Sequence, residues 1–174
     1  MVEYIILGFL LDREMSGYDV KQAIGLSTAN FYDASFGSIY PALQRLEAAG
    51  LVAVSAGVSG GRFKKLYRIS AAGRKRFFAW LEEPPVLHPT RNEHLVKLFF
   101  YGRLSAAKAA ALLDRLCGLL AGRLAAFEAL GPKVAGRADR FQLATLRYGV
   151  DYYRFMLDWF GCLRDEIAAG EGHE

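Results

Sequence analysis

Three of the chain's five prolines lie within the nine residues from Pro84 to Asn92. Proline lacks a backbone N–H group and disfavours the helical conformation of the residue before it, so this segment interrupts any regular helix or strand. It is the strongest candidate for a domain boundary in the 174 residues. We therefore expect two domains, residues 1–83 and 93–174, joined by a linker over residues 84–92.

Two helical patterns open the chain. Residues 2–11 form an apolar run without strict alternation, and the length of this run favours a helix over a strand. Ser16 and Asp19 then match the S-x-x-D form of a capping box, in which each side chain satisfies a free N–H group at the start of a helix. This spacing predicts a short second helix over about residues 17–26.

A third, amphipathic helix is predicted after Gly37. Its apolar positions follow at intervals of four and three residues, at Ile39, Leu43 and Leu46. Proline is tolerated in the first turn of a helix, where its missing N–H group would have no partner, so Pro41 predicts a helix start near Ser38. Gly50 should end the helix, since glycine readily adopts the left-handed conformation of a helix end.

A hairpin and a fourth helix come next. Two runs of β-prone residues, 51–54 and 63–69, flank a glycine-rich turn from Gly57 to Gly61, and this arrangement predicts a hairpin. A further helix should then cover residues 70–81. Three helices, a two-stranded wing and another helix form a winged helix-turn-helix. In that fold the third helix enters the major groove of DNA, and the wing contacts the neighbouring backbone.

The distribution of charge favours an anionic partner. The formal net charge is +4, and no acidic residue lies between Glu47 and Glu82. Seven cations fall in that interval: Arg62, Lys64, Lys65, Arg68, Arg74, Lys75 and Arg76. Cations on a wing can neutralise DNA phosphates, and their placement favours this role over the alternative of a merely solvated face.

The polar side of the third helix holds the candidates for base recognition. Ser38, Gln44 and Arg45 lie away from its apolar positions, and Tyr40 lies near its start. Polar residues on a helix usually form its solvated side, but in a helix-turn-helix this side faces DNA. We therefore expect Ser38, Gln44 and Arg45 to reach base edges.

Helical patterns fill the rest of the chain. After a helix that follows the linker, Ser105 opens an alanine- and leucine-rich helix to about Leu130. We expect Gly131 and Pro132 to break this helix. The last helix should span about residues 137–168.

The last helix carries two apolar stripes. The first contains Leu146, Val150, Tyr153, Leu157 and Phe160, and the second contains Tyr148, Tyr152, Phe155, Trp159 and Leu163. A single neighbouring helix cannot cover both, so we expect one stripe to pack within the subunit and the other against a second copy of the chain. The same aromatic residues, with Trp80, could line a pocket for a small molecule, but packing is their commoner role.

These patterns define the expected fold class. It is mainly α with a small β-hairpin: an N-terminal winged helix-turn-helix and a C-terminal α-helical dimerisation domain. Hydrophobic residues make up 53% of the chain, which is typical of a folded protein. Cys117 and Cys162 lie far apart in apolar helical stretches, and we expect both to be reduced core thiols.

The sequence offers no constellation typical of an enzyme. Its three histidines form no H-x-x-H pair, and it has neither a G-x-S-x-G elbow nor a G-x-x-x-x-G-K loop. We expect no catalytic residue, no metal and no cofactor. No segment has the pattern of an export signal or a membrane span, so we expect a cytoplasmic protein without a membrane partner.

Three strings of residues resemble the PadR family of bacterial transcriptional regulators. They are residues 16–19 (SGYD), residues 37–51, which contain the specific pattern G-x-I-Y-P-x-L-x-x-L-E-x-x-G-L, and residues 65–74 at the end of the wing. The resemblance covers residues 1 to about 83 closely. The helical remainder is similar to the longer C-terminal domain of one PadR subgroup, that of the virulence activators.

The resemblance implies a homodimer that binds a roughly palindromic operator in double-stranded DNA. Such a protein usually represses transcription, and a small-molecule effector releases some members from DNA. In the family, the residues that match Tyr40, Lys64 and Lys65 approach the DNA backbone, and the residue that matches Tyr18 lies near the same surface. Arg62, on the same wing, is a further candidate contact. The wing lacks the proline that the family often carries there.

We therefore expect sequence-specific transcriptional regulation, with repression as the first interpretation. Two alternatives stay open: a transcriptional activator of the same fold, and a winged-helix adaptor that binds protein and not DNA. Salt distinguishes the adaptor, because binding to several phosphates weakens steeply as ionic strength rises.

Overall fold

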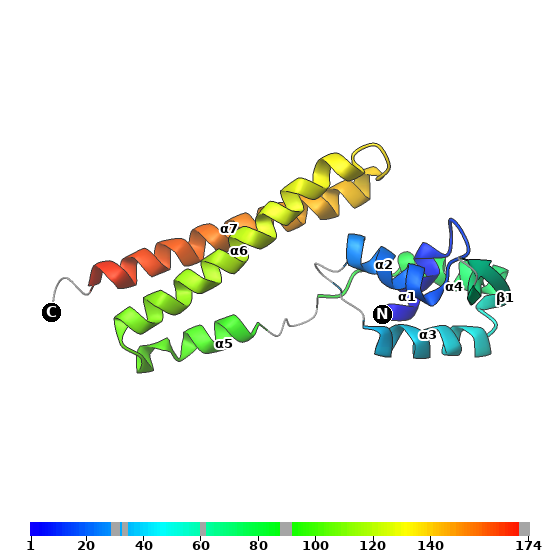
Figure 1. Ribbon diagram of the computed structural model, residues 1–174, viewed down its shortest axis with the longest axis horizontal. Coiled ribbons are helices and arrows are strands. Elements are labelled where there is room, and N and C mark those ends of the chain that lie inside the picture. The colour runs from blue at the N-terminus through cyan, green and yellow to red at the C-terminus, as the bar shows by residue number, and fades with distance from the viewer. Residues whose placement is uncertain (29–31, 33–34, 60–61, 88–91, 171–174) are drawn as a thin grey trace. The chain divides into compact units, whose positions relative to one another are not determined.

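The structure is a computed structural model of the whole chain. It describes residues 1–170 apart from 29–31, 33–34, 60–61 and 88–91, and it leaves aside the side chains of residues 58, 59, 62 and 63. The chain divides into two compact units, Met1–His88 and Pro89–Glu174 (Figure 1). Among the described residues, every helix is too short or too polar to cross a membrane.

The first unit has the predicted order of helices around one hairpin. Its elements are α1 (Val2–Phe9), α2 (Gly17–Ser27), α3 (Phe36–Ala48), β1 (Val52–Ser59), β2 (Arg62–Ile69) and α4 (Ala71–Leu81). The two strands run antiparallel, with Val52 opposite Ile69. The expected fold class, mainly α with a small β-hairpin in a winged helix-turn-helix, is confirmed.

The core of the first unit lies where α1, α2 and α3 meet. Its fully buried side chains include Ile6, Leu7, Val20, Ile24, Ile39 and Leu43. Burial of one such side chain contributes about 1.5–3 kcal/mol. The apolar side of α3 is therefore anchored in the core, and its polar side is left outward. Met15 and Tyr67 exchange backbone hydrogen bonds of 3.0 and 2.9 Å, which tie the α1–α2 connection to β2.

The predicted capping box at the start of α2 is confirmed. The Asp19 N–H donates to the Ser16 hydroxyl oxygen at 3.2 Å, and the Ser16 N–H donates to the Asp19 carboxylate at 3.0 Å. The Ser16 hydroxyl also donates to this carboxylate, at 2.7 Å. These hydrogen bonds favour the ionised carboxylate and thereby lower the pKa of Asp19. Partial burial acts in the opposite direction and raises this pKa, while the charges of Lys64 and Arg13 lower it further.

The prediction that α3 starts near Ser38 is wrong. The helix begins at Phe36, with Ser35 at the N-cap position, and Pro41 lies in its second turn. The missing N–H group of Pro41 deprives the Gly37 carbonyl of its usual donor. Both residues are exposed, so water can bond to that carbonyl, and the helix tolerates a proline beyond its first turn.

The predicted end of α3 at Gly50 is confirmed. Gly50 has a φ of 66°, a conformation that favours glycine. The Leu51 N–H donates to the Leu46 carbonyl at 2.9 Å, and the Gly50 N–H donates to the Glu47 carbonyl at 3.0 Å. This pair of bonds is a Schellman motif, which satisfies two carbonyls at the helix end and turns the chain into β1.

The hairpin is longer than predicted, because Gly57 lies inside β1 and not in the turn. It stands opposite Lys64 in the register of the two strands. A Cβ atom at Gly57 would collide with the side chain of Leu66. The glycine thus gives Leu66 room to lie across the partner strand, a packing role that its position between two β-prone runs does not reveal.

The second unit is α-helical. Its elements are α5 (Glu93–Phe99), the short 3₁₀ helix η1 (Tyr101–Arg103), α6 (Ala106–Val134) and α7 (Arg140–Gly170), and α6 and α7 lie side by side (Figure 1). The prediction that Gly131 and Pro132 break α6 is wrong. Pro132 is exposed, and the carbonyl that it leaves without a donor belongs to exposed Glu128, so hydration compensates as it does at Pro41.

The last helix starts three residues later than predicted, after a capping box. The Asp139 carboxylate accepts the N–H groups of Phe141 at 2.7 Å and Gln142 at 2.9 Å. In return, the Gln142 side-chain oxygen accepts the Asp139 N–H at 3.0 Å. The D-x-x-Q spacing is the sequence signal that would have located this start.

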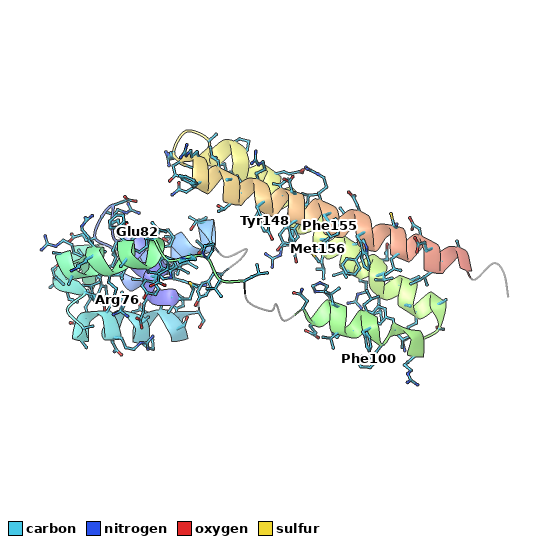
Figure 2. The ribbon with its side chains drawn as sticks, turned by 180° about the vertical axis from the view of Figure 1, so that it is seen from behind. Arg76, Glu82, Phe100, Tyr148, Phe155 and Met156 are labelled. Atoms are coloured by element: carbon cyan, nitrogen blue, oxygen red, sulfur yellow. The ribbon has the colours of Figure 1, made fainter. Side chains whose placement is uncertain are left out.

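The two stripes of α7 differ in burial, as the two-stripe interpretation requires. In the first stripe Phe160 is buried and the other four residues are half-buried, and Tyr153 and Leu157 pack with Phe160 in the α6–α7 core. In the second stripe Leu163 is half-buried against the same core, and the four aromatic residues are exposed: Tyr148, Tyr152, Phe155 and Trp159. Tyr148 and Phe155 are labelled in Figure 2. Packing of the first stripe within the subunit is confirmed, and pairing of the second with another copy stays a prediction.

The two cysteines differ in environment. Cys117 lies in the core between α6 and α7, as predicted, and burial raises the pKa of its thiol. Cys162 is exposed, so its prediction as a core thiol is wrong. It follows Trp159 by three residues and shares the outward side of α7, where an apolar neighbourhood in sequence does not imply burial.

Gly149 sets the distance between α6 and α7 and provides a test of this packing. It is buried in α7, and a Cβ atom there would collide with the buried ring of Phe127 in α6. We expect Gly149→Ala to lower the free energy of unfolding by about 1–3 kcal/mol, because overpacking outweighs the higher helix propensity of alanine. Denaturant unfolding measures this change.

Gly161 in the same helix is the matched control. A Cβ atom at this position would meet nothing within 4 Å. Gly161→Ala should therefore raise the free energy of unfolding by up to about 1 kcal/mol, since only the helix propensity changes. Similar stabilisation by both substitutions would contradict the role of Gly149.

The capping box predicts a pH-dependent contribution to stability. Because the folded-state pKa of Asp19 lies below 3.8, the ionised side chain stabilises the fold above this value, and the contribution is lost as the pH falls through the lowered pKa. We expect Asp19→Asn to lower the free energy of unfolding by about 1 kcal/mol at neutral pH and by nearly nothing in strong acid. Unfolding followed across acidic pH tests this, with Asp158→Asn as the control for an exposed carboxylate.

Candidate nucleic-acid interface

The outward side of α3 is built by the anchoring of its other side. Ile39 and Leu43 are fully buried, whereas Tyr40 and Gln44, each one residue further along, are exposed. α2 packs directly against α3. This is the arrangement in which a supporting helix presents the first turns of a reading helix to base edges.

Three aromatic rings form a row on this surface, which we call the aromatic row: Tyr18 of α2, and Phe36 and Tyr40 of α3. The Phe36 ring centroid lies 6.5 Å from that of Tyr18 and 6.1 Å from that of Tyr40, at interplanar angles of 16° and 24°. The exposed fractions are 51% for Tyr18, 45% for Phe36 and 46% for Tyr40. Sequence reasoning found the two tyrosines but missed Phe36, because it started α3 at Ser38.

Gly17 allows the Tyr40 ring to lie against the start of α2. A Cβ atom at Gly17 would lie 2.8 Å from a ring carbon of Tyr40 and 3.3 Å from a methyl carbon of Leu43. Carbon atoms do not pack at the shorter of these distances, so a side chain at position 17 would displace Tyr40. The position of Tyr40 therefore depends on a glycine between Ser16 and Tyr18.

Gln22 orients the hydroxyl group of Tyr18. Its Nε2 atom donates to the Tyr18 hydroxyl oxygen at 3.1 Å, one turn along α2. A phenol oxygen that accepts this bond keeps its own proton for donation. Tyr18 is thereby prepared to donate to an anionic oxygen such as that of a phosphate. Sequence reasoning missed Gln22, although its i+4 spacing from Tyr18 is a recognisable helix signal.

Ser38 and Arg45 have partners within the protein. The Ser38 hydroxyl donates to the Ser35 carbonyl at 2.9 Å, and Arg45 Nε lies 2.7 Å from the carboxylate of Glu3 in α1. Both side chains keep further hydrogen-bonding groups, because the Ser38 hydroxyl can still accept and the Arg45 guanidinium group has four more N–H donors on its Nη atoms. The exposed ion pair with Glu3 contributes about 0–1 kcal/mol, so it restrains Arg45 only weakly.

The two wing lysines differ in direction. Lys64 stands opposite Gly57 and Lys65 opposite Ala56, and successive side chains of a strand point to opposite faces. Lys65 is exposed, whereas Lys64 is half-buried. The charge of Lys64 contributes to the lowered pKa of Asp19, which indicates that Lys64 acts on the start of α2. The side chain of Arg62 lies outside the described residues.

The cations of α4 belong to a different surface. Arg74 donates from Nη2 to the Leu11 carbonyl at 3.1 Å. Figure 2 labels Arg76. Its guanidinium carbon lies 6.0 Å from the ring centroid of Tyr4. Trp80 stacks on the same Tyr4 ring, with the two ring centroids 4.5 Å apart. The segment without acidic residues therefore contains wing cations and two arginines, Arg74 and Arg76, that hold α4 against α1 and its following loop.

A hollow of about 240 Å³ opens on the second unit between α5, α6 and α7. Its lining is His94, Leu116, Leu119, Leu120, Arg123, Tyr152, Tyr153 and Met156. A mostly apolar wall with one imidazole and one guanidinium group suits a small, largely apolar molecule. Within the described ranges, no group of three or more His, Cys, Asp or Glu side chains could hold a metal ion.

Two family models match the chain. The transcriptional regulator PadR-like family matches residues 6–79, and the virulence activator alpha C-term family matches residues 90–167. The negative transcriptional regulator PadR of Bacillus subtilis is 24% identical over 151 residues, which are 86% of this chain and 83% of that protein. The transcriptional regulator Rv3488 of Mycobacterium tuberculosis is 38% identical over 69 residues, 40% of this chain and 62% of that protein.

Solved structures share this fold along nearly the whole chain. Bacillus subtilis PadR in complex with operator DNA matches with a TM-score of 0.87 at 22% identity and covers 95% of this chain and 96% of that chain. The same protein with p-coumaric acid matches at 0.79, with 21% identity and coverage of 96% and 98%. The virulence activator AphA of Vibrio cholerae matches at 0.75, with 23% identity and coverage of 97% and 99%.

The two family models fall on the two units of the structure. The first spans the winged helix-turn-helix, and the second spans α5, α6 and most of α7. The chain therefore belongs to the PadR-like family of transcriptional regulators, with a C-terminal domain of the virulence activator type.

Proposed function

We propose that this PadR-like regulator is a cytoplasmic, homodimeric repressor that binds a roughly palindromic operator in double-stranded DNA. The observation that carries the proposal is the outward side of α3, where Phe36 and Tyr40 of the aromatic row and Gln44 lie on the reading helix of a winged helix-turn-helix. Neither catalysis nor a cofactor has a part in it. We propose residues 1–83 as the DNA-binding domain, 84–92 as the linker and 93–174 as the dimerisation domain.

The proposed contacts divide into two kinds. Phosphate contacts come from the hydroxyl groups of Tyr18 and Tyr40 and from the cations of the wing. These groups offer hydrogen-bond donors or positive charge, but they do not match the pattern of one particular base edge. The wing contacts are Arg62, Lys64 and Lys65. The base-edge contacts are Ser38, Gln44 and Arg45. Gln44 is exposed, and Arg45 keeps the N–H donors of its Nη atoms for a base while its Nε atom bonds to Glu3.

The homodimer places two reading helices on one operator. A two-fold axis through paired C-terminal domains sets the two α3 helices in successive major grooves, about 34–36 Å apart. Support comes from the exposed aromatic stripe of α7 and from the operator complex of Bacillus subtilis PadR. Exposure of the four aromatic side chains in the second stripe of α7 is unfavourable in water, so we expect a second copy of the chain to bury them.

Effector release is a further part of the proposal. The hollow between α5, α6 and α7 offers a mostly apolar wall with His94 and Arg123, and Bacillus subtilis PadR has been solved with p-coumaric acid. Activation of transcription is the second candidate function, supported by the likeness to the virulence activator AphA. A transcription assay from the bound promoter distinguishes repression from activation.

The wing lysines test DNA binding against the adaptor alternative. We expect the double substitution Lys64→Ala and Lys65→Ala to weaken binding to every DNA sequence alike, since phosphate contacts carry no sequence information. The slope of log K against log salt should become shallower by about 0.9 for each phosphate that the variant no longer neutralises. Fluorescence anisotropy on a labelled duplex at several salt concentrations measures both effects.

A variant with the same charge change is the control. Lys97 and Lys133 are exposed lysines of the second unit, and their double substitution by alanine also removes two positive charges. Its salt slope should equal that of the parent. If the parent bound DNA with no salt dependence, or if both double variants changed the slope equally, the wing would not be a phosphate-binding element.

The second stripe of α7 tests the homodimer. Phe155 is 65% exposed within one subunit, so Phe155→Glu leaves the α6–α7 core intact but puts a charge in the proposed interface. We expect a monomer by sedimentation velocity and a decrease of operator affinity of at least tenfold, because the two half-sites no longer act together. Leu26→Glu, at a 70% exposed position of α2, should remain a dimer. A dimeric Phe155→Glu variant would contradict the assignment of the stripe.

A further inference from the structure

We propose that Phe36 reads the C5-methyl group of a thymine in the operator. The inference rests on the proposed function and names one element of its sequence preference. Phe36 is the first residue of α3. In a helix-turn-helix, the residues at the start of the reading helix lie nearest the base edges. Phe36 therefore has the position of a base-contacting residue.

The structure holds the Phe36 ring in a defined place. Its ring lies between those of Tyr18 and Tyr40, at centroid distances of 6.5 and 6.1 Å and nearly parallel to both. Tyr40 is in turn fixed by its contact with Gly17, and Tyr18 is fixed by the bond from Gln22. An apolar ring of this size is usually buried, yet Phe36 is 45% exposed. Its neighbours thus present it outward on a rigid support.

The chemistry of the ring selects its partner. Phenylalanine has no hydrogen-bond donor or acceptor, so it can offer DNA only an apolar contact. In the major groove the apolar group on a base edge is the C5-methyl of thymine. The tyrosines on both sides have hydroxyl groups suited to phosphates. The aromatic row would therefore join two backbone contacts with one apolar base contact between them.

Deoxyribose carbons are the competing apolar surface in DNA. They occur at every nucleotide, so a contact with them would carry no sequence information. A contact with a thymine methyl instead depends on one base and disappears when thymine is replaced by deoxyuridine, which pairs identically. This substitution changes one methyl group and leaves the sugar, the phosphate and the hydrogen-bonding edge unchanged.

The experiment uses the full-length chain and duplexes that it selects from a randomised pool. Each thymine of the selected duplex is replaced in turn by deoxyuridine, and affinities are measured by fluorescence anisotropy. We expect one thymine in each half-site whose replacement weakens binding about fourfold, and about fifteenfold when both half-sites are changed, as removal of one buried methyl group per subunit predicts. Phe36→Ala should bind the thymine and deoxyuridine duplexes equally.

The control is Leu26→Ala, which truncates an exposed apolar side chain on α2. This variant should keep the preference for thymine. A parent protein indifferent to deoxyuridine at every position would overturn the role of Phe36, and so would a Phe36→Ala variant with an undiminished preference. If Phe36→Ala fails to fold, Phe36→Gln at the same half-exposed position is the second variant, and it should likewise lose the preference for thymine. A selection that enriched no sequence at all would instead contradict the proposed function.

Discussion

The contact between the Tyr40 ring and the backbone of Gly17 is the constraint on which the reading surface depends. It brings the start of α2 against the outer edge of α3, while Ile39 and Leu43 anchor the inner side of the same helix. The capping box of Ser16 and Asp19 fixes where α2 starts. Each of the four consecutive residues SGYD therefore has its own role. Ser16 and Asp19 form the capping box, Gly17 leaves space for the Tyr40 ring, and Tyr18 is the exposed tyrosine.

In the second unit too, a glycine allows close contact between a helix and an aromatic ring. Gly149 brings α7 against the buried ring of Phe127, and the first stripe of α7 packs against α6 at this close distance. The aromatic residues of the second stripe lie on another side of α7 and are exposed. If the second stripe pairs with another copy, as we propose, stability of the subunit and assembly of the dimer depend on different sides of one helix, and assembly could change without loss of the fold.

Local patterns predicted most elements of this fold, because periodicity, capping boxes and a left-handed glycine act within a few residues of chain. The failures also have a common cause. Pro41 and Pro132 can lie inside helices because the residues whose carbonyls they leave without a donor, Gly37 and Glu128, are exposed to water. Gly57 lies in a strand, where Leu66 of the partner strand fills the space of its missing side chain. The ion pair of Arg45 with Glu3 joins residues 42 positions apart. Exposure and distant contacts are properties of the folded chain that spacing along the sequence does not contain.

The cations show how this limits a functional interpretation. Along the sequence, seven basic residues form one segment without acidic residues, but Arg74 and Arg76 are engaged with α1 and its following loop. The surface that we propose for phosphate binding therefore contains fewer cations than the sequence indicates. Affinity for DNA depends strongly on the number of phosphates neutralised, so a single subunit with few wing cations should bind weakly. In the proposed homodimer, two subunits on one operator would double that number and add their base contacts, so the proposed dimerisation through the second unit would be a condition of specific binding.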